Sequence, residues 1–329
     1  MSWRAAAGLG VLLVAAAVGL GLSFGRIARP PAPTPIHVSV TTSPLPSPTR
    51  VLVDEATLFK QPISAGCATT DSVFVFTNGG GMLRYDGTSW AQIDDTLRSL
   101  TSAACGQGIA YAVGPVGELA IVDEVARQIR STAVATDDLY GVGTFADGAL
   151  LVGANGSVYL LYQGDIQPFA AGIDENLRDV AIFGLQSAWA VGQDGITYRL
   201  DQRGWNPVGS GQTKTLLSVA ATTSADAVAV GEGGVIVRWD NGWQAVTSSV
   251  TTTLRDVIIK PSVWIAGDHG TLLTGTLGAL RAIDLHTQCD LVAVFSRGNE
   301  IWVLGNAGVA GGAWRLTLDG AVAQHFGGC

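Results

Sequence analysis

The chain has 329 residues, of which 47% are hydrophobic and 14% are charged, and its formal net charge is −8. The first 50 residues hold four arginines and no acidic residue, so residues 51–329 hold 15 basic and 27 acidic side chains, a net charge of −12. This sign argues against a nucleic-acid-binding protein, whose binding surface is normally basic.

The N-terminus carries an apolar segment. Residues 5–24 are all uncharged and mostly apolar, and they are flanked by Arg4, Arg26 and Arg29. As a helix they would span about 30 Å, the thickness of a bilayer core. We predict that residues 1–28 are a hydrophobic helix that anchors the chain in a membrane through residues 5–24. A cleaved signal peptide is the alternative.

The next segment, residues 29–50, is rich in proline. Seven of the twelve prolines lie between residues 30 and 48. Such a composition does not build a packed core and is typical of an extended linker. We therefore predict a stalk that holds the rest of the chain away from the membrane.

A repeated unit begins near residue 60. Its marker is an apolar run that ends in a glycine, with a second glycine three positions later, and it recurs with a period of about 40 residues, in the range of propeller blades. One further period before the first marker pair reaches Phe76, with Gly79 after it. The marker pairs are Gly114/Gly117, Gly153/Gly156, Gly192/Gly195, Gly231/Gly234, Gly267/Gly270 and Gly305/Gly308. Together with the Phe76 position they predict seven units.

Each unit has the pattern of four short strands. The fourth unit contains β-branched or aromatic runs at 177–183, 187–192, 195–200 and 205–208, separated by turn residues. Four strands in each of seven units predict an all-β fold, a seven-bladed β-propeller over residues 51–329. The segment 319–326 is expected to be the fourth strand of the last blade. The alternative is that residues 51–58 add a strand to that blade.

The residues three positions before the markers are expected to pack between blades, because a blade alone cannot bury both faces of its sheet. These residues are Val73, Tyr111, Leu150, Trp189, Val228, Trp264 and Trp302. A second aromatic set, at the start of the fourth strands, is expected to have the same role, and a ligand-binding aromatic box is the alternative. Its members are Trp90, Trp205 and Trp243.

The four cysteines form two pairs with the spacing of a blade. Cys67 and Cys105 are separated by one period of the repeat, and Cys289 and Cys329 are separated by nearly the same interval. We predict disulfides Cys67–Cys105 and Cys289–Cys329, the second fixing the end of the chain to the last blade. Disulfides are typical of an oxidising, extracytoplasmic compartment. Buried free thiols are the alternative.

Two rings of polar residues are expected on one face of the propeller. The first lies between the marker glycines and includes Asp194, Glu232, Asp268, His269 and Asn306. The second lies where the first strands begin, near the central channel, and includes Arg98, Tyr140, Arg178, Asp179, Arg255 and Asp256. Turn chemistry and surface ion pairs would also explain these residues. The functional interpretation is a charged face that docks a partner or a cation.

The repeat motifs WAVGQDGITYRLDQRGW at 189–205 and VAVGEGGVIVRWDNGW at 228–243 resemble those of bacterial propellers of the Asp-box (BNR) and Ycf48-like group, which includes sialidases and photosystem assembly factors. Only fragments of an Asp box occur, at 86–90 and 240–243. A sialidase also needs three arginines and a tyrosine nucleophile. Arg98, Arg178 and Arg255 are candidates for the arginines, and the sequence offers no matching tyrosine and carboxylate pair.

The sequence holds no HExxH, GxSxG or Walker motif, so whether the chain is an enzyme stays open, with a non-enzyme favoured. We expect a monomeric binding module at the cell surface or in the periplasm, with an unidentified protein or glycan ligand and neither metal nor cofactor. The alternatives are a sialidase-like carbohydrate-active enzyme, for which Asp194, Glu232 and Asp268 would be the nominated carboxylates, and an assembly factor of an envelope complex.

Overall fold

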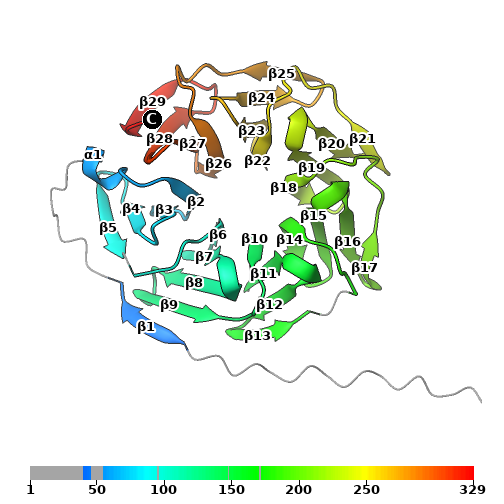
Figure 1. The fold of residues 1–329 in the computed structure, drawn as a ribbon, viewed down its shortest axis with the longest axis horizontal. Helices are drawn as coiled ribbons and strands as arrows, with labels where there is room; N and C mark the ends of the chain where they lie inside the picture. The colour runs from blue at the N-terminus through cyan, green and yellow to red at the C-terminus, as the bar shows by residue number, and fades with distance from the viewer. Residues whose placement is uncertain (1–39, 46–54, 95, 147, 170–171) are drawn as a thin grey trace, which may run out of the picture. The chain divides into compact units, whose positions relative to one another are not determined.

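The computed structural model describes residues 40–45, 55–94, 96–146, 148–169 and 172–329, which form a seven-bladed β-propeller (Figure 1). In every blade four consecutive strands pair in chain order, from the central channel outward. The predicted all-β, seven-bladed architecture is therefore confirmed. The predicted hydrophobic helix at 5–24 lies outside the described residues. Within the described ranges, no helix is long and apolar enough to cross a membrane.

The first four blades follow one another along the chain. Blade 1 contains β2 (Ile63–Ala68), β3 (Val73–Thr77), β4 (Met82–Tyr85) and β5 (Trp90–Asp94). Blade 2 contains β6 (Ser102–Gly106), β7 (Ile109–Val113), β8 (Glu118–Asp123) and β9 (Gln128–Ala133). Blade 3 contains β10 (Leu139–Phe145), β11 (Gly148–Gly153), β12 (Val158–Tyr162) and β13 (Asp165–Pro168). Blade 4 contains β14 (Leu177–Gly184), β15 (Ser187–Gly192), β16 (Thr197–Asp201) and β17 (Gly204–Pro207).

Three more blades complete the ring. Blade 5 contains β18 (Leu216–Thr223), β19 (Asp226–Gly231), β20 (Ile236–Trp239) and β21 (Trp243–Ala245). Blade 6 contains β22 (Leu254–Ile259), β23 (Val263–Gly267), β24 (Leu272–Thr276) and β25 (Ala279–Ala282). Blade 7 contains β26 (Asp290–Arg297), β27 (Glu300–Ala307), β28 (Ala310–Thr317) and β29 (Val322–Gly327). Short 3₁₀ turns follow four of the second strands: Pro115–Gly117, Ala154–Gly156, Gln193–Gly195 and Glu232–Gly234.

The marker glycines recur because the backbone leaves no room for a side chain. A Cβ added to Gly192 would lie 2.1 Å from the carbonyl oxygen of Asn176, and one added to Gly195 would lie 2.3 Å from that of Gln212. Gly195 also has a φ of +72°, in the left-handed region that favours glycine. The period in the sequence therefore marks a close backbone approach in blades 2 to 6, whereas a Cβ added to Gly308 of blade 7 would meet nothing within 4 Å.

In blade 1 the marker position lies one residue after the predicted one. Ile63 lies opposite Thr77 in its ladder, as Leu139 lies opposite Gly153, so Thr77 and not Phe76 holds the marker position. Phe74 consequently packs towards blade 2, whereas the predicted Val73 packs on the blade 7 side. The other six predicted inter-blade residues are at most 7% exposed, in agreement with the prediction.

The C-terminal segment completes blade 7 by itself. β29 pairs with β28, which confirms the interpretation of 319–326 as the fourth strand. The described end of the segment 51–58 is instead a short helix, α1 (Glu55–Leu58). Leu58 and the following Phe59 pack beneath blades 7 and 1 with Trp302 and Phe326. The ring therefore closes by packing across this seam, with no strand of blade 7 supplied by the described N-terminal residues.

Part of the predicted stalk belongs to the propeller. β1 (Thr41–Pro44) pairs antiparallel with β9, so blade 2 has a fifth, outermost strand, and Leu45 is buried against this blade. The prediction of an extended segment without a packed core is therefore wrong for residues 41–45. The outer strand of a blade has an unpaired edge, and a short β-branched run can satisfy its hydrogen bonds.

Both predicted disulfides are present. Cys67–Cys105 joins the innermost strands of blades 1 and 2, with 5.5 Å between the Cα atoms. Cys289–Cys329 joins the C-terminus to the segment that precedes β26, with 6.1 Å between the Cα atoms. The two bonds are typical of proteins that fold in an oxidising, extracytoplasmic compartment.

Candidate functional site

The turns between second and third strands lie at the same end of the blades as the segments that lead into the first strands. The Gln193 amide donates to the Asn176 carbonyl, and the Glu232 amide donates to the Thr215 carbonyl, each at 3.0 Å. The two loop sets thus share one face, as predicted. We call this end of the propeller, with its turns at 115–117, 154–156, 193–195, 232–234 and 268–270, the turn face.

Backbone geometry accounts for many of the polar residues on the turn face. Asn155, Asp194 and His269 have φ values of +52°, +55° and +57°. Asparagine, aspartate and histidine adopt this left-handed conformation several-fold more often than other residues with a side chain. The explanation by turn chemistry therefore holds for these positions and does not by itself require a ligand.

Each of three turns is also fixed by a side chain of the next blade. The carboxylate of Asp138 accepts a hydrogen bond from the Val116 amide at 2.9 Å, and the side-chain oxygen of Asn176 accepts one from the Asn155 amide at 2.9 Å. Asp290 caps the His269 amide in the same way at 3.0 Å. Sequence reasoning missed these three caps, although each directly precedes a leucine at the start of a first strand, and Asp290 is itself the first residue of β26.

The predicted acidic residues do not form one cluster. Asp194 and Glu232 are exposed, and their side chains have no hydrogen bond or ion pair within the described residues. Asp268 is half-buried and forms an ion pair with Arg255. No group of three or more histidine, cysteine or acidic residues that could hold a metal ion occurs in the described part of the chain. Asp194, Glu232 and Asp268 therefore stand as separate charges on the turn face.

Asn306 does not belong to this set. Its side-chain oxygen accepts a hydrogen bond from the Ile63 amide, and its side-chain amide donates to the Ile63 carbonyl, both at 2.6 Å. It therefore joins blade 7 to blade 1. β27 runs beyond its marker glycine, Gly305, and carries Asn306 within the strand, so Asn306 has a structural partner that the sequence pattern did not indicate.

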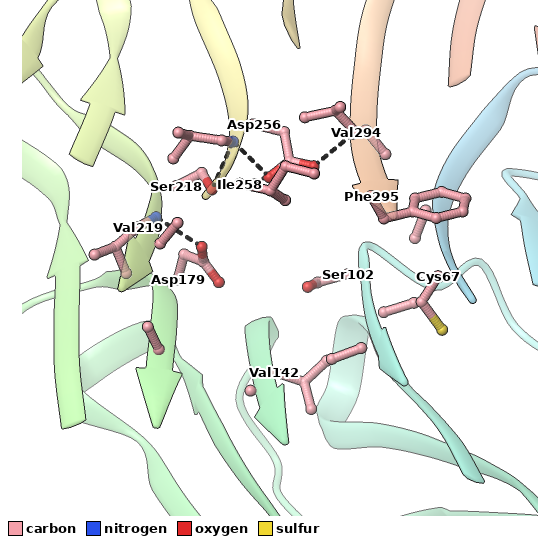
Figure 2. Close-up of a pocket in the computed structure, with 18 of the residues that line it drawn as sticks. Cys67, Ser102, Val142, Asp179, Ser218, Val219, Asp256, Ile258, Val294 and Phe295 are labelled. Atoms are coloured by element: carbon pink, nitrogen blue, oxygen red, sulfur yellow. Dashed lines mark hydrogen bonds between the residues drawn. The ribbon is translucent and has the colours of Figure 1, made fainter. Parts of the chain in front are cut away.

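The central channel contains a cavity of about 480 Å³ that is lined by the first strands of all seven blades. Its wall consists mainly of small or apolar residues, and Figure 2 shows Val142, Val219, Ile258 and Phe295 among them. The polar lining residues are Ser64, Thr101, Ser102, Tyr140, Thr144, Arg178, Asp179, Ser218, Arg255, Asp256 and Ser296. Tyr140, Arg178, Asp179, Arg255 and Asp256 thus share one cavity, as the second predicted ring requires.

Asp179 and Asp256 connect neighbouring blades along this wall. The Asp179 carboxylate accepts a hydrogen bond from the Val219 amide at 2.8 Å, and that of Asp256 accepts one from the Val294 amide at 2.7 Å (Figure 2). The Ser218 hydroxyl, which sequence reasoning missed, donates to Asp256 at 2.9 Å. A bulge before each aspartate and before Ser218 interrupts the first strand and turns the side chain towards the next blade.

Burial changes the acidity of both carboxyls. Desolvation is the largest cause, and it raises the pKa of Asp179 to about 7 and the pKa of Asp256 to about 6. The amide of Val219 lowers the pKa of Asp179, and the charge of Asp256 raises it further. Both residues therefore titrate near neutral pH while they serve as acceptors between blades.

The arginines of the second ring have different surroundings. The Arg178 guanidinium lies 4.4 Å from the centre of the Tyr140 ring, a cation–π contact at the channel mouth, and its Nε has no hydrogen-bond partner among the described residues. Arg255 is held by Asp268. The prediction that Arg98 lies beside them was wrong, because the chain enters the first strand of blade 2 only after Leu100. Arg98 lies outside the channel lining, with its Nε 3.7 Å from a carboxylate oxygen of Glu118.

Comparison with known proteins supports the fold alone. No protein family matches the sequence, and no curated protein matches it. The WD40 β-propeller domain of Doa1 aligns with 82% of this chain and 93% of its own length, with a TM-score of 0.66 and 11% identity. The structure of the RRP9 WD40 repeats aligns with 83% of this chain over 92% of its own length, with a TM-score of 0.60 and 9% identity. The computationally designed protein Ika8 aligns with 81% of this chain over 87% of its own length, with a TM-score of 0.59 and 12% identity.

Proposed function

We propose that this chain is a non-enzymatic binding module that recognises a protein or glycan partner outside the cytoplasm with its turn face. The observation that carries the proposal is the fixed position of exposed charges there. Asp194 lies on a turn of blade 4 whose backbone is hydrogen-bonded, through the Gln193 amide, to the segment that enters the first strand of the same blade. Glu232 lies on the equivalent turn of blade 5, which is held in the same way. Charged groups on rigid turns lose little conformational freedom when a partner binds.

The charges favour a basic partner surface. Residues 51–329 have a net charge of −12, and Asp194 and Glu232 are exposed without a counter-ion among the described residues. A complementary basic patch would be steered towards this face and would keep its register through these carboxylates. Arg178 and Tyr140 at the channel mouth add a flat cationic and aromatic contact near the centre of the face.

The expected location fits this role. Two disulfides support an extracytoplasmic site, and we propose that the apolar segment at 5–24 and the proline-rich segment that follows hold the propeller at the cell surface or in the periplasm. The repeat motifs at 189–205 and 228–243 further suggest kinship with the Asp-box and Ycf48-like propellers. An assembly factor of an envelope complex is the specific form of binding module that this kinship suggests.

One observation favours the enzymatic alternative. Tyr140, Arg178, Arg255 and Asp179 line the same channel cavity, and a sialidase combines arginines, a tyrosine and a carboxylate. However, Arg255 is paired with Asp268, and Asp179 accepts a backbone hydrogen bond, so both groups already have structural partners. Hydrolysis of a fluorogenic sialoside by the full chain, lost in Tyr140→Phe, would favour the enzyme over the binding module.

The binding proposal is tested by comparing two charge-matched double variants. Asp194→Asn/Glu232→Gln removes two negative charges from the turn face and keeps an asparagine at the left-handed position, whereas Asp165→Asn/Asp226→Asn removes two from hairpins at the other ends of the strands. The full chain and both variants are immobilised in detergent and exposed to an envelope extract of the producing cells. We expect a retained partner whose yield falls at least ten-fold only for the turn-face variant, with unchanged melting temperatures. Equal yields from both variants would refute the proposal.

A further inference from the structure

A second cavity, of about 280 Å³, lies between blades 2 and 3. The cavity lies at the ends of the strands opposite to the turn face, beside the hairpins around Gln107 and Gln163. Ile109, Tyr111 and Ile121 line it from blade 2, and Phe145, Leu161 and Ile166 line it from blade 3. The volume is close to the lower end, about 300 Å³, of the range for small-molecule sites in proteins.

This seam lacks two indole rings that two other seams have. Between blades 7 and 1, Trp302 packs against Trp90 with 6.0 Å between ring centres. Between blades 4 and 5, Trp189 packs against Trp243 at 5.2 Å.

Smaller residues hold the equivalent positions between blades 2 and 3. Tyr111 lies three positions before its marker glycine, as Trp189 and Trp302 do. Ile166 lies opposite Leu161 in the outer ladder, as Trp90 lies opposite Tyr85. A tyrosine and an isoleucine fill less space than two tryptophans, and both residues line the cavity.

Two polar groups in this apolar surrounding have no partner. The Nε of Arg130 is buried and makes no hydrogen bond, and Arg130 forms no ion pair within the described residues. The hydroxyl of Tyr111 likewise has no hydrogen bond in the described part of the chain. Tyr111 lies opposite Ile121 and Ile121 lies opposite Arg130 in neighbouring ladders of blade 2, so the three side chains share one face of the sheet. Burial raises the pKa of Tyr111, the positive charge of Arg130 lowers it, and the negative charge of Asp123 raises it.

Arg130 is half-buried, and its buried Nε–H group without an acceptor is costly; a carboxylate is the group whose geometry matches a guanidinium. A phenol hydroxyl can donate a further hydrogen bond to the same carboxylate. We propose that this cavity is a binding site for a small monocarboxylate that carries a compact aromatic or branched apolar group. The carboxylate lies at Arg130 and Tyr111, and the apolar group fills the space beside Phe145, Leu161 and Ile166. The site is independent of the turn face.

The test uses the full chain in detergent and two fluorinated probes observed by ¹⁹F NMR. The acid is 4-fluorophenylacetate, and its uncharged counterpart is 4-fluorophenylacetamide. We expect the acid to bind at least ten-fold more tightly than the amide. Arg130→Met should remove this preference, and Ile166→Trp, which supplies the missing indole, should abolish binding of both probes. Arg203→Met, which removes an exposed arginine from a hairpin of blade 4, is the control and should bind as the wild type does.

Three results would overturn the assignment. These are no binding of the acid to the wild type, equal affinity for acid and amide, or unchanged binding in Ile166→Trp. The Ile166→Trp protein is also followed by thermal denaturation. A melting temperature at or above that of the wild type shows that the loss of binding comes from a filled cavity and not from unfolding.

Discussion

The buried carboxyl of Asp179 should make the stability of this propeller depend on pH in a defined direction. Its pKa is raised to about 7 in the folded chain, chiefly by desolvation, from 3.8 for an exposed aspartate. Between these values the folded protein holds one proton more than the unfolded chain. This contribution to stability is therefore fully present below pH 4 and is lost as the pH rises through the folded pKa near 7.

The size of the effect follows from the difference in pKa. A difference of roughly 3 units corresponds to about 4 kcal/mol, since each unit is worth about 1.4 kcal/mol. Asp256, with a pKa of about 6, acts in the same direction, and its charge raises the pKa of Asp179. Asp179→Asn keeps an oxygen acceptor for the Val219 amide and removes the titrating proton. The variant should therefore gain stability relative to the wild type, by about 4 kcal/mol, as the pH rises from 4 to 8.

Urea unfolding at half-unit pH steps, followed by tryptophan fluorescence, measures this difference directly. The matched control is Asp165→Asn, which changes an exposed carboxyl on the outer strand of blade 3. Its stability difference from the wild type should stay constant over the same range. A constant difference for Asp179→Asn as well would show that this carboxyl does not hold an extra proton in the folded state, and the reasoning would fail.

The remaining predictions concern ring closure. Asn306→Ala leaves the amide and the carbonyl of Ile63 without their partner and should lower the unfolding free energy by about 2–4 kcal/mol. The control Asn299→Ala, on an exposed hairpin, should lower it by less than about 0.5 kcal/mol. Similar losses for both variants in urea titrations would contradict the link between blades 7 and 1. Replacing Cys289 and Cys329 by serine should lower stability by about 2–4 kcal/mol, and an unchanged melting temperature would mean that this disulfide does not constrain the chain.

The architecture was predictable because it follows from a steric requirement that blades 2 to 6 repeat. Gly192 and its equivalents in these blades lie too close to a carbonyl for any side chain, so the glycine period survives although the rest of the repeat varies. Where this requirement is absent, the glycine period no longer locates the turn. Thr77 replaces the glycine in blade 1, and counting one period back from Gly114 therefore predicts Phe76 instead.

The disulfide pairing was correct for a reason that holds only in part. Cys67 lies opposite Phe74 in its ladder, but Cys105 lies opposite Ala110, so the two cysteines do not occupy equivalent positions. The spacing of one blade was still informative, because first strands of adjacent blades run side by side around the channel (Figure 1). Arg98 shows the limit of such counting: Leu97 and Leu100 are both buried, and the sequence does not tell which one begins the blade.

The candidate site was less predictable, because its residues are defined by contacts between blades. Asp194 was recognised as a turn residue, but the capping roles of Asp138 and Asn176 depend on the distance to the preceding blade. The role of Ser218 likewise depends on a bulge that brings its hydroxyl to Asp256 of the next blade. Periodicity locates residues within a unit, and it carries no information about which of two neighbouring units a side chain will contact.

The same limit explains why the seams differ although the blades are alike. A disulfide joins the inner strands of blades 1 and 2, aspartate carboxylates join blade 4 to 5 and blade 6 to 7, and Asn306 joins blade 7 to 1. Blades 2 and 3 are joined near the channel by threonine hydroxyls, from Thr101 to the Leu139 carbonyl and from Thr144 to the Cys105 carbonyl. This seam also has Tyr111 and Ile166 where the seams 7/1 and 4/5 have pairs of tryptophans. A propeller that joins its blades by different contacts can keep its ring closed and still accommodate a ligand at one seam.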